Sequence, residues 1–416
     1  MLKLYNTMAR KKEVFEPRND RVVKMFTCGP SIYGRPHVGN YRSFLWEDVL
    51  QRYLGFLGYR VERVLNFTDV EDKAIAEAEK TRMTIEDLTA ANAEQFFADA
   101  RDLRIELPNH IPRSSTSVDQ AVKLIQILLG KGYAYWYGKD VFFDPLKFNG
   151  FGKLFRLDMS RWPKEKKRFK KDTYPGRRWN LGDFILWHGY KPGDKVYWDT
   201  GIGKGRPSWN IQDPAMITET LGYTVDISCG GIDNLYRHHD YNIAVIEAVS
   251  GEEFSRYWIH GEHLLVDGKK MSKSVGNIIY PQDLMKEGYS ARSIRFYLLY
   301  GHHREPLNLT KKIFEKTTQK LVLLNGLVEK LSSGDSGGSR ARKTDSSVEA
   351  LIDRLIPDFE RNMNDDLNIK GAFDATFENL SQLVSLKVDG KVTGKQCEKI
   401  RKELIRIDKV FQFILQ

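Results

Sequence analysis

Apolar and polar residues recur at two different spacings along the chain, and these spacings predict its strands and helices. Residues 22–28 form a short apolar run that ends at a Gly-Pro pair, as a buried strand does. From His37 onward, apolar residues recur every three or four positions, which is typical of one face of a helix. The same order of strand and helix returns over residues 60–66 and 85–103. This pattern predicts that residues 1–115 form the first half of a doubly wound α/β fold with a parallel sheet.

The middle of the chain changes its pattern twice. Residues 116–200 begin with helical spacing over 118–129 and then become strand-like and basic, so we expect an insertion there. Residues 201–310 return to the α/β pattern, with a strand predicted at 224–227 and a helix at 242–249. This segment is expected to complete a Rossmann-like domain.

The C-terminal part, residues 311–416, has helical spacing throughout. Two apolar stripes carry this pattern: Leu321, Leu324 and Val328, then Leu351, Leu355 and Phe359. Between them, residues 332–347 are rich in Ser, Gly and charge, which predicts a flexible connection. A final helix is predicted at 393–413. We therefore expect an α-helical bundle after the α/β domain.

A loop with closely spaced lysines is the clearest candidate for chemistry. Its core is Lys270-Met271-Ser272-Lys273-Ser274, with a glycine shortly before and after it. Such a loop can bring ammonium groups to a triphosphate as negative charge moves to the departing pyrophosphate. Far upstream, His37-Val38-Gly39-Asn40 opens the first helix, whose N-terminus offers free N–H groups to phosphate. Alone, such a loop is more often a solvated surface turn, and His37 could be a helix-start residue with no role.

Together, in this order and about 230 residues apart, the two segments resemble the signature motifs of class I aminoacyl-tRNA synthetases. Asn40 stands where that family usually has a second histidine, and its amide can still hydrogen-bond a phosphate or ribose. Further segments are similar to the cysteinyl-tRNA synthetase family in order and spacing. They are Thr27-Cys28-Gly29-Pro30-Ser31-Ile32-Tyr33, Asn66-Phe67-Thr68-Asp69-Val70-Glu71-Asp72-Lys73, Gly205-Arg206-Pro207-Ser208-Trp209 and Gly230-Gly231-Ile232-Asp233-Asn234-Leu235-Tyr236-Arg237-His238-His239.

The resemblance implies an ATP-dependent enzyme that forms an aminoacyl-adenylate, most simply with cysteine, and transfers the amino acid to tRNA. It implies catalytic roles for four residues: His37, Asn40, Lys270 and Lys273. Gly39 and Ser272 join these four in the implied ATP site, and Mg²⁺ would arrive with ATP. Tyr33, Thr68, Trp209 and Asp233 match the positions that hold the amino acid, where the Asp233 carboxylate suits an α-ammonium.

The family also holds a zinc ion with two cysteines, a histidine and a glutamate, and this zinc binds the substrate sulfur. The corresponding residues here are Cys28, Asp213, His238 and Asn242. The first three remain candidate zinc ligands, whereas a neutral carboxamide is a poor one, so Asn242 is not expected to bind. Without zinc, Asp213, Ser228 and Asn242 would instead be expected to form a polar pocket for a different side chain.

Composition limits the partners and the cellular compartment that fit this activity. The chain has 416 residues and a net charge of +10, which suits a polyanionic partner. The densest basic stretch, residues 164–179, interleaves aromatic residues and could bind a single-stranded acceptor end, although a solvated insertion loop has the same composition. Three cysteines offer no disulfide framework, and no apolar run would span a bilayer, so we expect a cytoplasmic protein without membrane contact.

The acceptor of the activated amino acid is open at this point. Transfer to tRNA is the leading hypothesis, but the family's small anticodon-reading domain has no counterpart after the last predicted helix, so anticodon recognition is not expected. A ligase of this fold that joins cysteine to an amino-sugar in mycothiol synthesis suggests a small-molecule amine as the alternative. A non-catalytic RNA-binding paralogue is a third hypothesis, which the complete lysine loop disfavours. Nothing in the sequence predicts the oligomeric state.

Overall fold

The computed structural model describes residues 1–161, 182–272, 275–332 and 346–415. Three features expected from the sequence lie outside these residues. They are the predicted catalytic Lys273, the basic stretch 164–179 and most of the 332–347 connection.

A parallel sheet of four strands forms the centre of the molecule, in the order β11, β10, β3, β4. The strands are β3 (Val22–Thr27), β4 (Arg60–Leu65), β10 (Val225–Gly231) and β11 (Ser255–Gly261). Strands β3 and β10 pair with Thr27 opposite Cys229, although they lie about 200 residues apart in the sequence. The two halves of the α/β domain therefore meet at the carboxyl ends of these two strands, where open α/β sheets bind their ligands.

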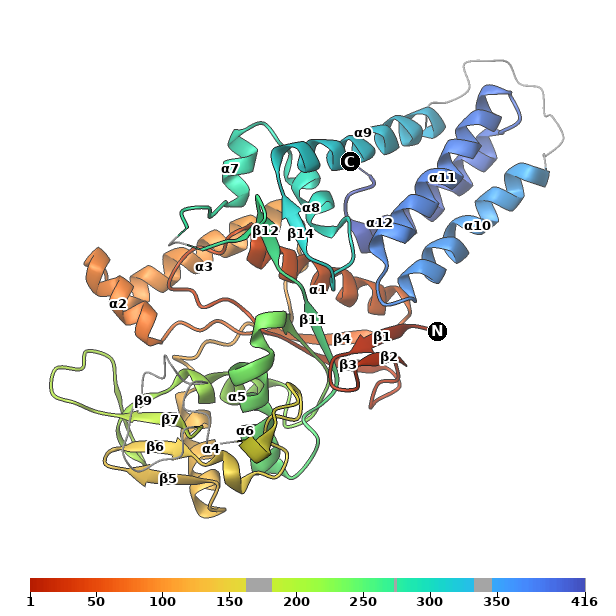
Figure 1. Ribbon diagram of the computed structural model, residues 1–416. Helices are drawn as coiled ribbons and strands as arrows, with labels where there is room; N and C mark the ends of the chain where they lie inside the picture. Colours follow the sequence, from red (N-terminus) through yellow and green to blue (C-terminus); the bar gives the residue numbers. More distant parts are fainter. Residues whose placement is uncertain (162–181, 273–274, 333–345, 416) are drawn as a thin grey trace.

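Helices cover both faces of this sheet (Figure 1). On one face lie α1 (Val38–Phe56) and α3 (Ile85–Asp102), and on the other α5 (Trp209–Thr220) and α6 (Asp240–Ser250). The alternation of side chains along β3 explains this arrangement, because Met25 joins the core that contains α1 while Phe26 joins the core that contains α5 and α6. A short helix α2 (Asp72–Thr81) precedes α3.

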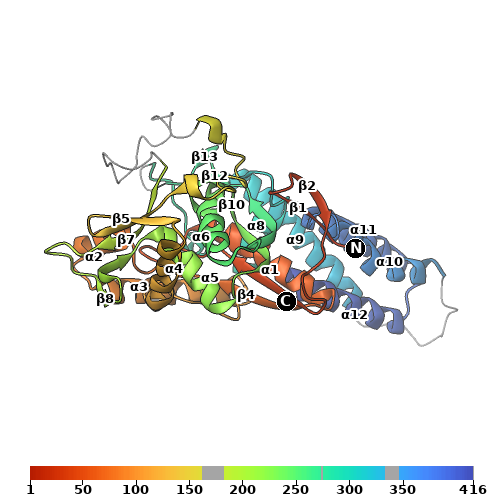
Figure 2. The same cartoon turned by 90° about the horizontal axis from the view of Figure 1, so that it is seen from below.

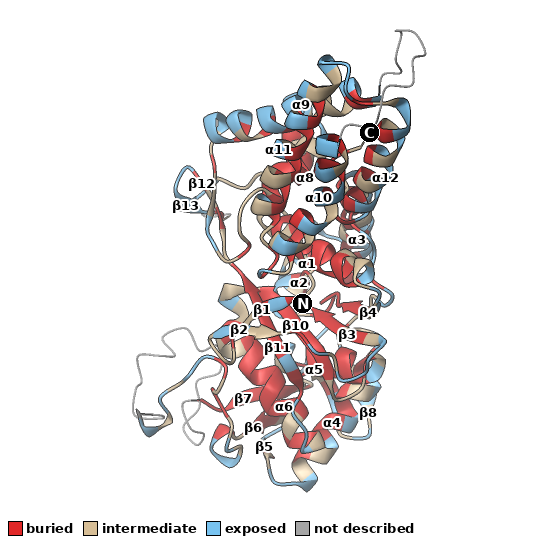
Figure 3. Ribbon diagram, turned by 90° about the vertical axis from the view of Figure 1, so that its right-hand side faces the viewer, coloured by how far each residue is buried: buried red, intermediate tan, exposed pale blue. Residues whose placement is uncertain are grey.

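An insertion between the two halves forms its own antiparallel sheet in the order β5, β6, β7, β9, β8. Its strands are β5 (Ala134–Tyr137), β6 (Asp140–Phe143), β7 (Phe184–Gly189), β8 (Trp198–Thr200) and β9 (Gly203–Pro207). Helix α4 (Val118–Gly130) packs with this sheet and with α5 and α6 in a separate hydrophobic core. Figure 3 shows the insertion as a lobe below the central sheet, opposite the C-terminal helices.

The lysine loop follows a small sheet ordered β13, β12, β14, built from β12 (Leu264–Val266), β13 (Lys269–Lys270) and β14 (Leu307–Leu309). Between β13 and β14 come the helices α7 (Pro281–Lys286) and α8 (Ala291–Leu299). Short turns of 3₁₀ helix occur at Pro145–Lys147, Met159–Arg161 and Ile232–Asn234, and a π-helical turn occurs at Leu235–His239.

The C-terminal part is helical, as the apolar stripes predict. It consists of α9 (Lys311–Ser332), α10 (Ser346–Met363), α11 (Ile369–Val388) and α12 (Gly394–Phe411), and α12 contacts α1 of the first half (Figures 1 and 2). An N-terminal hairpin, β1 (Lys3–Asn6) with β2 (Lys11–Val14), connects to the segment after α10 through Lys3 and Asp365. In the described part of the chain, none of the helices has the length and hydropathy needed to cross a membrane.

Candidate active site

A cavity of about 650 Å³ lies at the carboxyl ends of β3 and β10. Its walls come from the segment after β3, the start of α1, the start of α5, the turn after β10 and the hairpin that leads into the lysine loop. Twelve of the residues singled out in the sequence line it together: Cys28, Tyr33, His37, Gly39, Asn40, Thr68, Trp209, Asp213, Asp233, His238, Lys270 and Ser272. The fold thus gathers segments more than 200 residues apart in the sequence into one pocket.

His37 forms the N-cap of α1 together with Asn40. The Nδ1 atom of His37 accepts the backbone N–H of Asn40 at 3.3 Å, and Asn40 Oδ1 accepts the backbone N–H of His37 at 3.0 Å. Burial lowers the pKa of His37, so the imidazole is neutral near pH 7 and carries its proton on Nε2. This end of the cavity therefore offers an Nε2–H donor beside a helix N-terminus, which is a suitable environment for phosphate.

Gly39 packs closely at this helix start, where a side chain would have to displace the end of Met271. A Cβ at this position would lie 2.8 Å from Met271 Cε and 3.0 Å from the ring of His37. Met271 is buried against this position, which fixes the beginning of the lysine loop against α1. The two nucleotide motifs are therefore in direct contact.

Lys270 points into the cavity and pairs with Asp233. Its Nζ atom lies 2.9 Å from Asp233 Oδ2 and 3.4 Å from His263 Nε2. Burial alone would raise the pKa of the Asp233 carboxyl, but the hydrogen bond and charge of Lys270 lower it below its usual range. Asp233 is therefore ionised, and it already holds an ammonium group in this structure.

The far wall of the cavity is formed by Tyr33, Thr68 and Trp209. Thr68 is buried and exchanges backbone hydrogen bonds with the segment after β3: its N–H donates to Pro30 O, and its carbonyl accepts from Ile32 N. The Trp209 ring stacks on His238 with a centroid separation of 4.3 Å. Backbone hydrogen bonds thus hold Thr68 against the segment after β3, and ring stacking holds Trp209 against His238.

Cys28, Asp213 and His238 lie together at the base of this pocket. His238 Nε2 is 2.8 Å from Asp213 Oδ2 and 3.2 Å from Cys28 Sγ, and Cys28 Sγ is 3.9 Å from Asp213 Oδ2. Asn66 Nδ2 donates to the other carboxylate oxygen of Asp213 at 2.8 Å and so directs Oδ2 toward His238. Burial of the sulfur, followed by the charge of Asp213, raises the pKa of the Cys28 thiol.

These three side chains fit a zinc ion. Tetrahedral zinc with bonds of about 2.0–2.3 Å has ligand–ligand separations of about 3.3–3.6 Å, and the three separations here lie between 2.8 and 3.9 Å. One sulfur, one carboxylate oxygen and one imidazole nitrogen are all common zinc donors. Asn242 is buried on α6 and does not line the cavity, and neither does Ser228. Asp213, Ser228 and Asn242 were expected to form a polar pocket in the absence of zinc. Of these three, only Asp213 lines the cavity.

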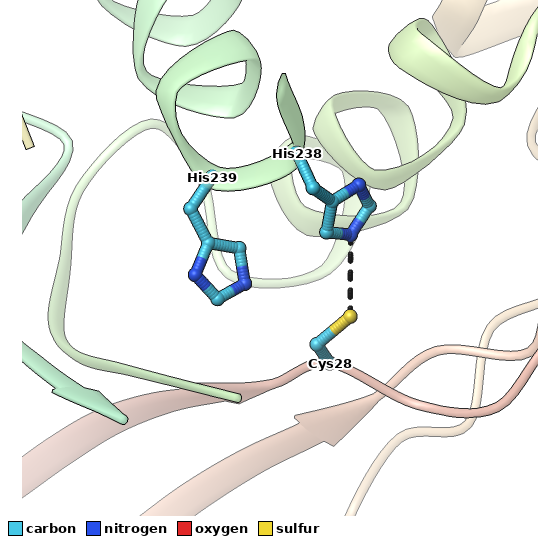
Figure 4. A group of neighbouring side chains, drawn as sticks. All are labelled: Cys28, His238 and His239. Carbon is cyan, nitrogen blue, oxygen red and sulfur yellow. Dashed lines mark hydrogen bonds between the residues drawn. The ribbon is translucent and has the colours of Figure 1, made fainter. Parts of the chain in front are cut away.

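Two residues of this site were not singled out in the sequence. Asn66 lines the cavity and orients Asp213. His239 is not among the residues that line the cavity, but one of its ring nitrogens lies within 4.8 Å of a ring nitrogen of His238 and of Cys28 Sγ (Figure 4). The adjacent histidine pair was visible in the sequence, but the family resemblance implied a zinc ligand only at His238.

Comparison with known proteins gives a family for this arrangement. Residues 14–319 match the family model described as the catalytic domain of class I tRNA synthetases (C). The chain is 38% identical to the cysteine–tRNA ligase of Chlamydia pneumoniae over 415 residues, covering 98% of this chain and 85% of that protein. It is 39% identical to the cysteine–tRNA ligase of Chlamydia abortus over 388 residues, covering 92% of this chain and 79% of that protein.

Solved structures share the fold at lower sequence identity. The methionyl-tRNA synthetase of Mycobacterium tuberculosis, in complex with methionyl-adenylate, superposes with a TM-score of 0.70. The alignment covers 94% of this chain and 92% of that structure at 16% identity. This similarity concerns the fold alone, and it agrees with the doubly wound sheet, the insertion and the C-terminal helices described above.

Proposed function

The chain belongs to the cysteine–tRNA ligase family of class I tRNA synthetases, and from this premise we propose that its cavity activates cysteine with ATP and transfers it to tRNA. The observation that carries the proposal is the joint cavity, in which the helix start at His37, the lysine loop and the ammonium-binding Asp233 face one another. Adenylate formation needs a nucleotide and an amino acid within reach of each other, and this arrangement supplies both sides of the reaction.

At the nucleotide side, the reaction requires charge stabilisation and no covalent nucleophile. The amino-acid carboxylate attacks the α-phosphate of ATP in line, a P–O bond to the β-phosphate breaks, and pyrophosphate leaves with bound Mg²⁺. Neutral His37 would donate its Nε2–H to phosphate, and Asn40 would use the Nδ2 group that its cap leaves available. Lys270, Ser272 and Lys273 would hold the β- and γ-phosphates, and Gly39 leaves room for the nucleotide at the helix start.

At the amino-acid side, Asp233 would receive the α-ammonium group. This carboxylate is ionised and already pairs with an ammonium, that of Lys270. Tyr33, Thr68 and Trp209 would enclose the substrate, with the Trp209 ring held in place by its stack on His238. The cysteine side chain would then point toward Cys28, Asp213 and His238 at the base of the pocket.

Zinc would be held by Cys28, Asp213 and His238. When bound, it would supply a soft Lewis-acidic centre that favours the sulfur of cysteine over the hydroxyl of serine. The protein residues contribute orientation, since Asn66 fixes the Asp213 carboxylate and Trp209 fixes the plane of His238. Because the Cys28 thiol is protonated in the absence of metal, zinc binding would release its proton to solvent.

Amino-acid-dependent exchange of pyrophosphate into ATP tests the activation step. We expect exchange with cysteine and with no other amino acid at comparable rate, in the absence of tRNA. His37→Ala should abolish it, whereas the matched variant His110→Ala should retain it, because His110 pairs with Glu62 outside the cavity. Absence of exchange with any amino acid would contradict the proposal.

Charging of bulk tRNA tests the acceptor. Formation of cysteinyl-tRNA by a protein that shows exchange would support transfer to tRNA. Exchange without charging would favour a small-molecule amine acceptor and would contradict the tRNA part of the proposal while leaving activation intact.

A further inference from the structure

His239 is a fully buried histidine whose Nε2 atom has no hydrogen-bond partner among the described residues. A ring nitrogen of His239, a ring nitrogen of His238 and the Cys28 sulfur all lie within 4.8 Å of one another. Figure 4 shows both imidazoles extending from one turn toward Cys28 at the end of β3. Because an unpaired buried nitrogen costs free energy, His239 Nε2 is available to a partner other than the described residues.

The backbone of this turn explains how two successive histidines reach the same place. Both belong to the π-helical turn Leu235–His239, in which Tyr236 is extended and Arg237 has a left-handed φ of 71°. A regular helix would direct successive side chains about 100° apart. A left-handed arginine is unfavourable in isolation, and irregular turns of this kind concentrate at functional sites.

Hydrogen bonds behind His239 hold its ring in an orientation suited to metal binding. Its Nδ1 atom lies 2.8 Å from His260 Nε2, and His260 Nδ1 lies 2.9 Å from Thr7 Oγ1. If each Nδ1–H donates toward Thr7, the lone pair of His239 is on Nε2, the nitrogen without a partner among the described residues. Metal-binding histidines commonly donate their other ring N–H in this way.

We infer that His239 Nε2 completes a four-donor zinc site with Cys28 Sγ, Asp213 Oδ2 and His238 Nε2, and that Asn242 takes no part in it. The inference rests on the proposed function for the location of the metal, and it changes the ligand set. One thiolate, one carboxylate and two neutral imidazoles balance the charge of Zn²⁺, and zinc can expand to a fifth position, which the substrate sulfur would take. Ligand separations in tetrahedral zinc are about 3.3–3.6 Å. The His239 nitrogen lies within 4.8 Å of Cys28 Sγ and of a ring nitrogen of His238, so it needs to approach these two donors by little more than about 1 Å.

A second cluster of metal-binding residue types lies elsewhere in the described structure and is a poorer candidate. It contains His302, His303 and Asp366. His302 Nδ1 accepts the backbone N–H of Arg304, so its Nε2 keeps a proton and faces Asp366. The Arg304 guanidinium already occupies Asp366 at 2.7 Å. A cation at this cluster would meet a positive neighbour and a protonated nitrogen, so His303 serves as a control.

The wild-type protein gives the first test without any substitution. Metal-free protein is reconstituted with Zn²⁺ alone, in the absence of substrates, and examined by elemental analysis and X-ray absorption at the zinc edge. We expect one zinc per chain, with one sulfur and three nitrogen or oxygen neighbours and the outer-shell scattering of two imidazoles. One imidazole, or failure to bind zinc, would overturn the inference.

Three matched variants give the second test, with zinc affinity measured by competition against a chelator. His239→Ala should weaken zinc binding by more than about 10²-fold, beyond the 10–100-fold typical of an outer-shell partner. Asn242→Ala should leave the affinity unchanged, and so should His303→Ala, which also removes a buried histidine with unpaired nitrogens. Thermal denaturation checks that each variant is folded.

The outcomes separate this inference from the proposed function. Loss of zinc in Asn242→Ala but not in His239→Ala would overturn the inference, and so would loss of zinc only in His303→Ala. Pyrophosphate exchange is measured on the same wild-type preparation. Exchange together with a zinc site that has one imidazole would support the proposed function and refute only the role of His239. A zinc site with two imidazoles but no exchange would support the role of His239 and contradict the proposed function.

Discussion

The ammonium group of Lys270 lies 2.9 Å from the carboxylate of Asp233, the residue expected to bind the α-ammonium of the amino acid. The two residues are 37 positions apart in the sequence, and the lysine donates its hydrogen bond to Asp233 Oδ2. An amino acid bound at Asp233 would compete with Lys270, and the displaced lysine would be free to reach the phosphates of ATP. We therefore expect the pair to connect amino-acid binding with the position of the lysine loop.

Removal of the Asp233 charge should weaken amino-acid binding specifically. We expect Asp233→Asn to raise the KM for cysteine by about 10–100-fold, since a charge-assisted hydrogen bond contributes about 1.5–3 kcal/mol. The KM for ATP should change much less. Both constants can be measured by pyrophosphate exchange, with Asp199→Asn on the exposed strand β8 as the control. A similar rise in both KM values would contradict the assignment of Asp233 to the ammonium.

Loss of the second lysine of the loop should affect the transition state more than the bound substrates. We expect Lys273→Ala to lower kcat for activation by about 10²–10³-fold with a smaller effect on the KM for ATP, because the lysine acts as charge moves to pyrophosphate. Lys273 lies outside the described residues, so this prediction rests on the sequence motif. Lys269→Ala, an exposed neighbour on β13, should retain near-normal activity. Equal losses in binding and in kcat would argue against this role for Lys273.

The pH dependence of activation should reflect the neutral state of His37. Burial lowers the pKa of His37 below 6.5, so the neutral ring persists at pH 6.5 and is lost only at lower pH. Protonation of Nδ1 would then break the cap to Asn40. We expect kcat/KM for ATP to stay flat between pH 8 and about 6.5 and to fall below it. His110→Asn should give the same profile, and a fall already above pH 6.5 that disappears in His37→Asn would refute the prediction.

Metal removal should reveal how the side chain of the substrate is recognised. We expect Cys28→Ser to lose bound zinc and, with it, the preference for cysteine over serine in pyrophosphate exchange. Cys397→Ser, a partly buried cysteine on α12, should lose neither. A protein that remains free of metal yet still prefers cysteine strongly would contradict a zinc-based selection.

Stability should decrease as pH rises between about 4.5 and 8 because of Glu47. Burial raises the pKa of this carboxyl to about 8, although Arg63 opposes the shift. In this interval the unfolded chain has lost the Glu47 proton while the folded chain retains it, so folding becomes less favourable with each unit of pH. Glu47→Gln should flatten the dependence of Tm on pH over this interval relative to the wild type. An unchanged slope would show that Glu47 is ionised in the fold.

Much of the molecule follows from local sequence signals. The apolar run at 22–28 is strand β3, the period that begins at His37 is helix α1, and the segment at 85–103 is helix α3 almost to the residue. These elements are set by side-chain periodicity and by capping residues such as His37 and Asn40, which act within a few positions of one another. The comparisons confirmed the family resemblance and the doubly wound fold with its insertion and helical bundle. Both predictions depend on the order of local elements and on short sequence motifs, which the sequence shows directly.

Other features of the site depend on contacts between segments that are far apart in the sequence. Strand order in the sheet places Cys28 beside β10, and a turn with a left-handed Arg237 brings His239 next to His238 and Cys28. The pairing of Lys270 with Asp233, and the absence of Ser228 and Asn242 from the cavity wall, also depend on packing between elements. Sequence spacing specifies which residue types are available and on which local element each lies. The distances and directions of these side chains in the site depend on packing between distant segments and on irregular backbone conformations, which short-range sequence patterns do not predict.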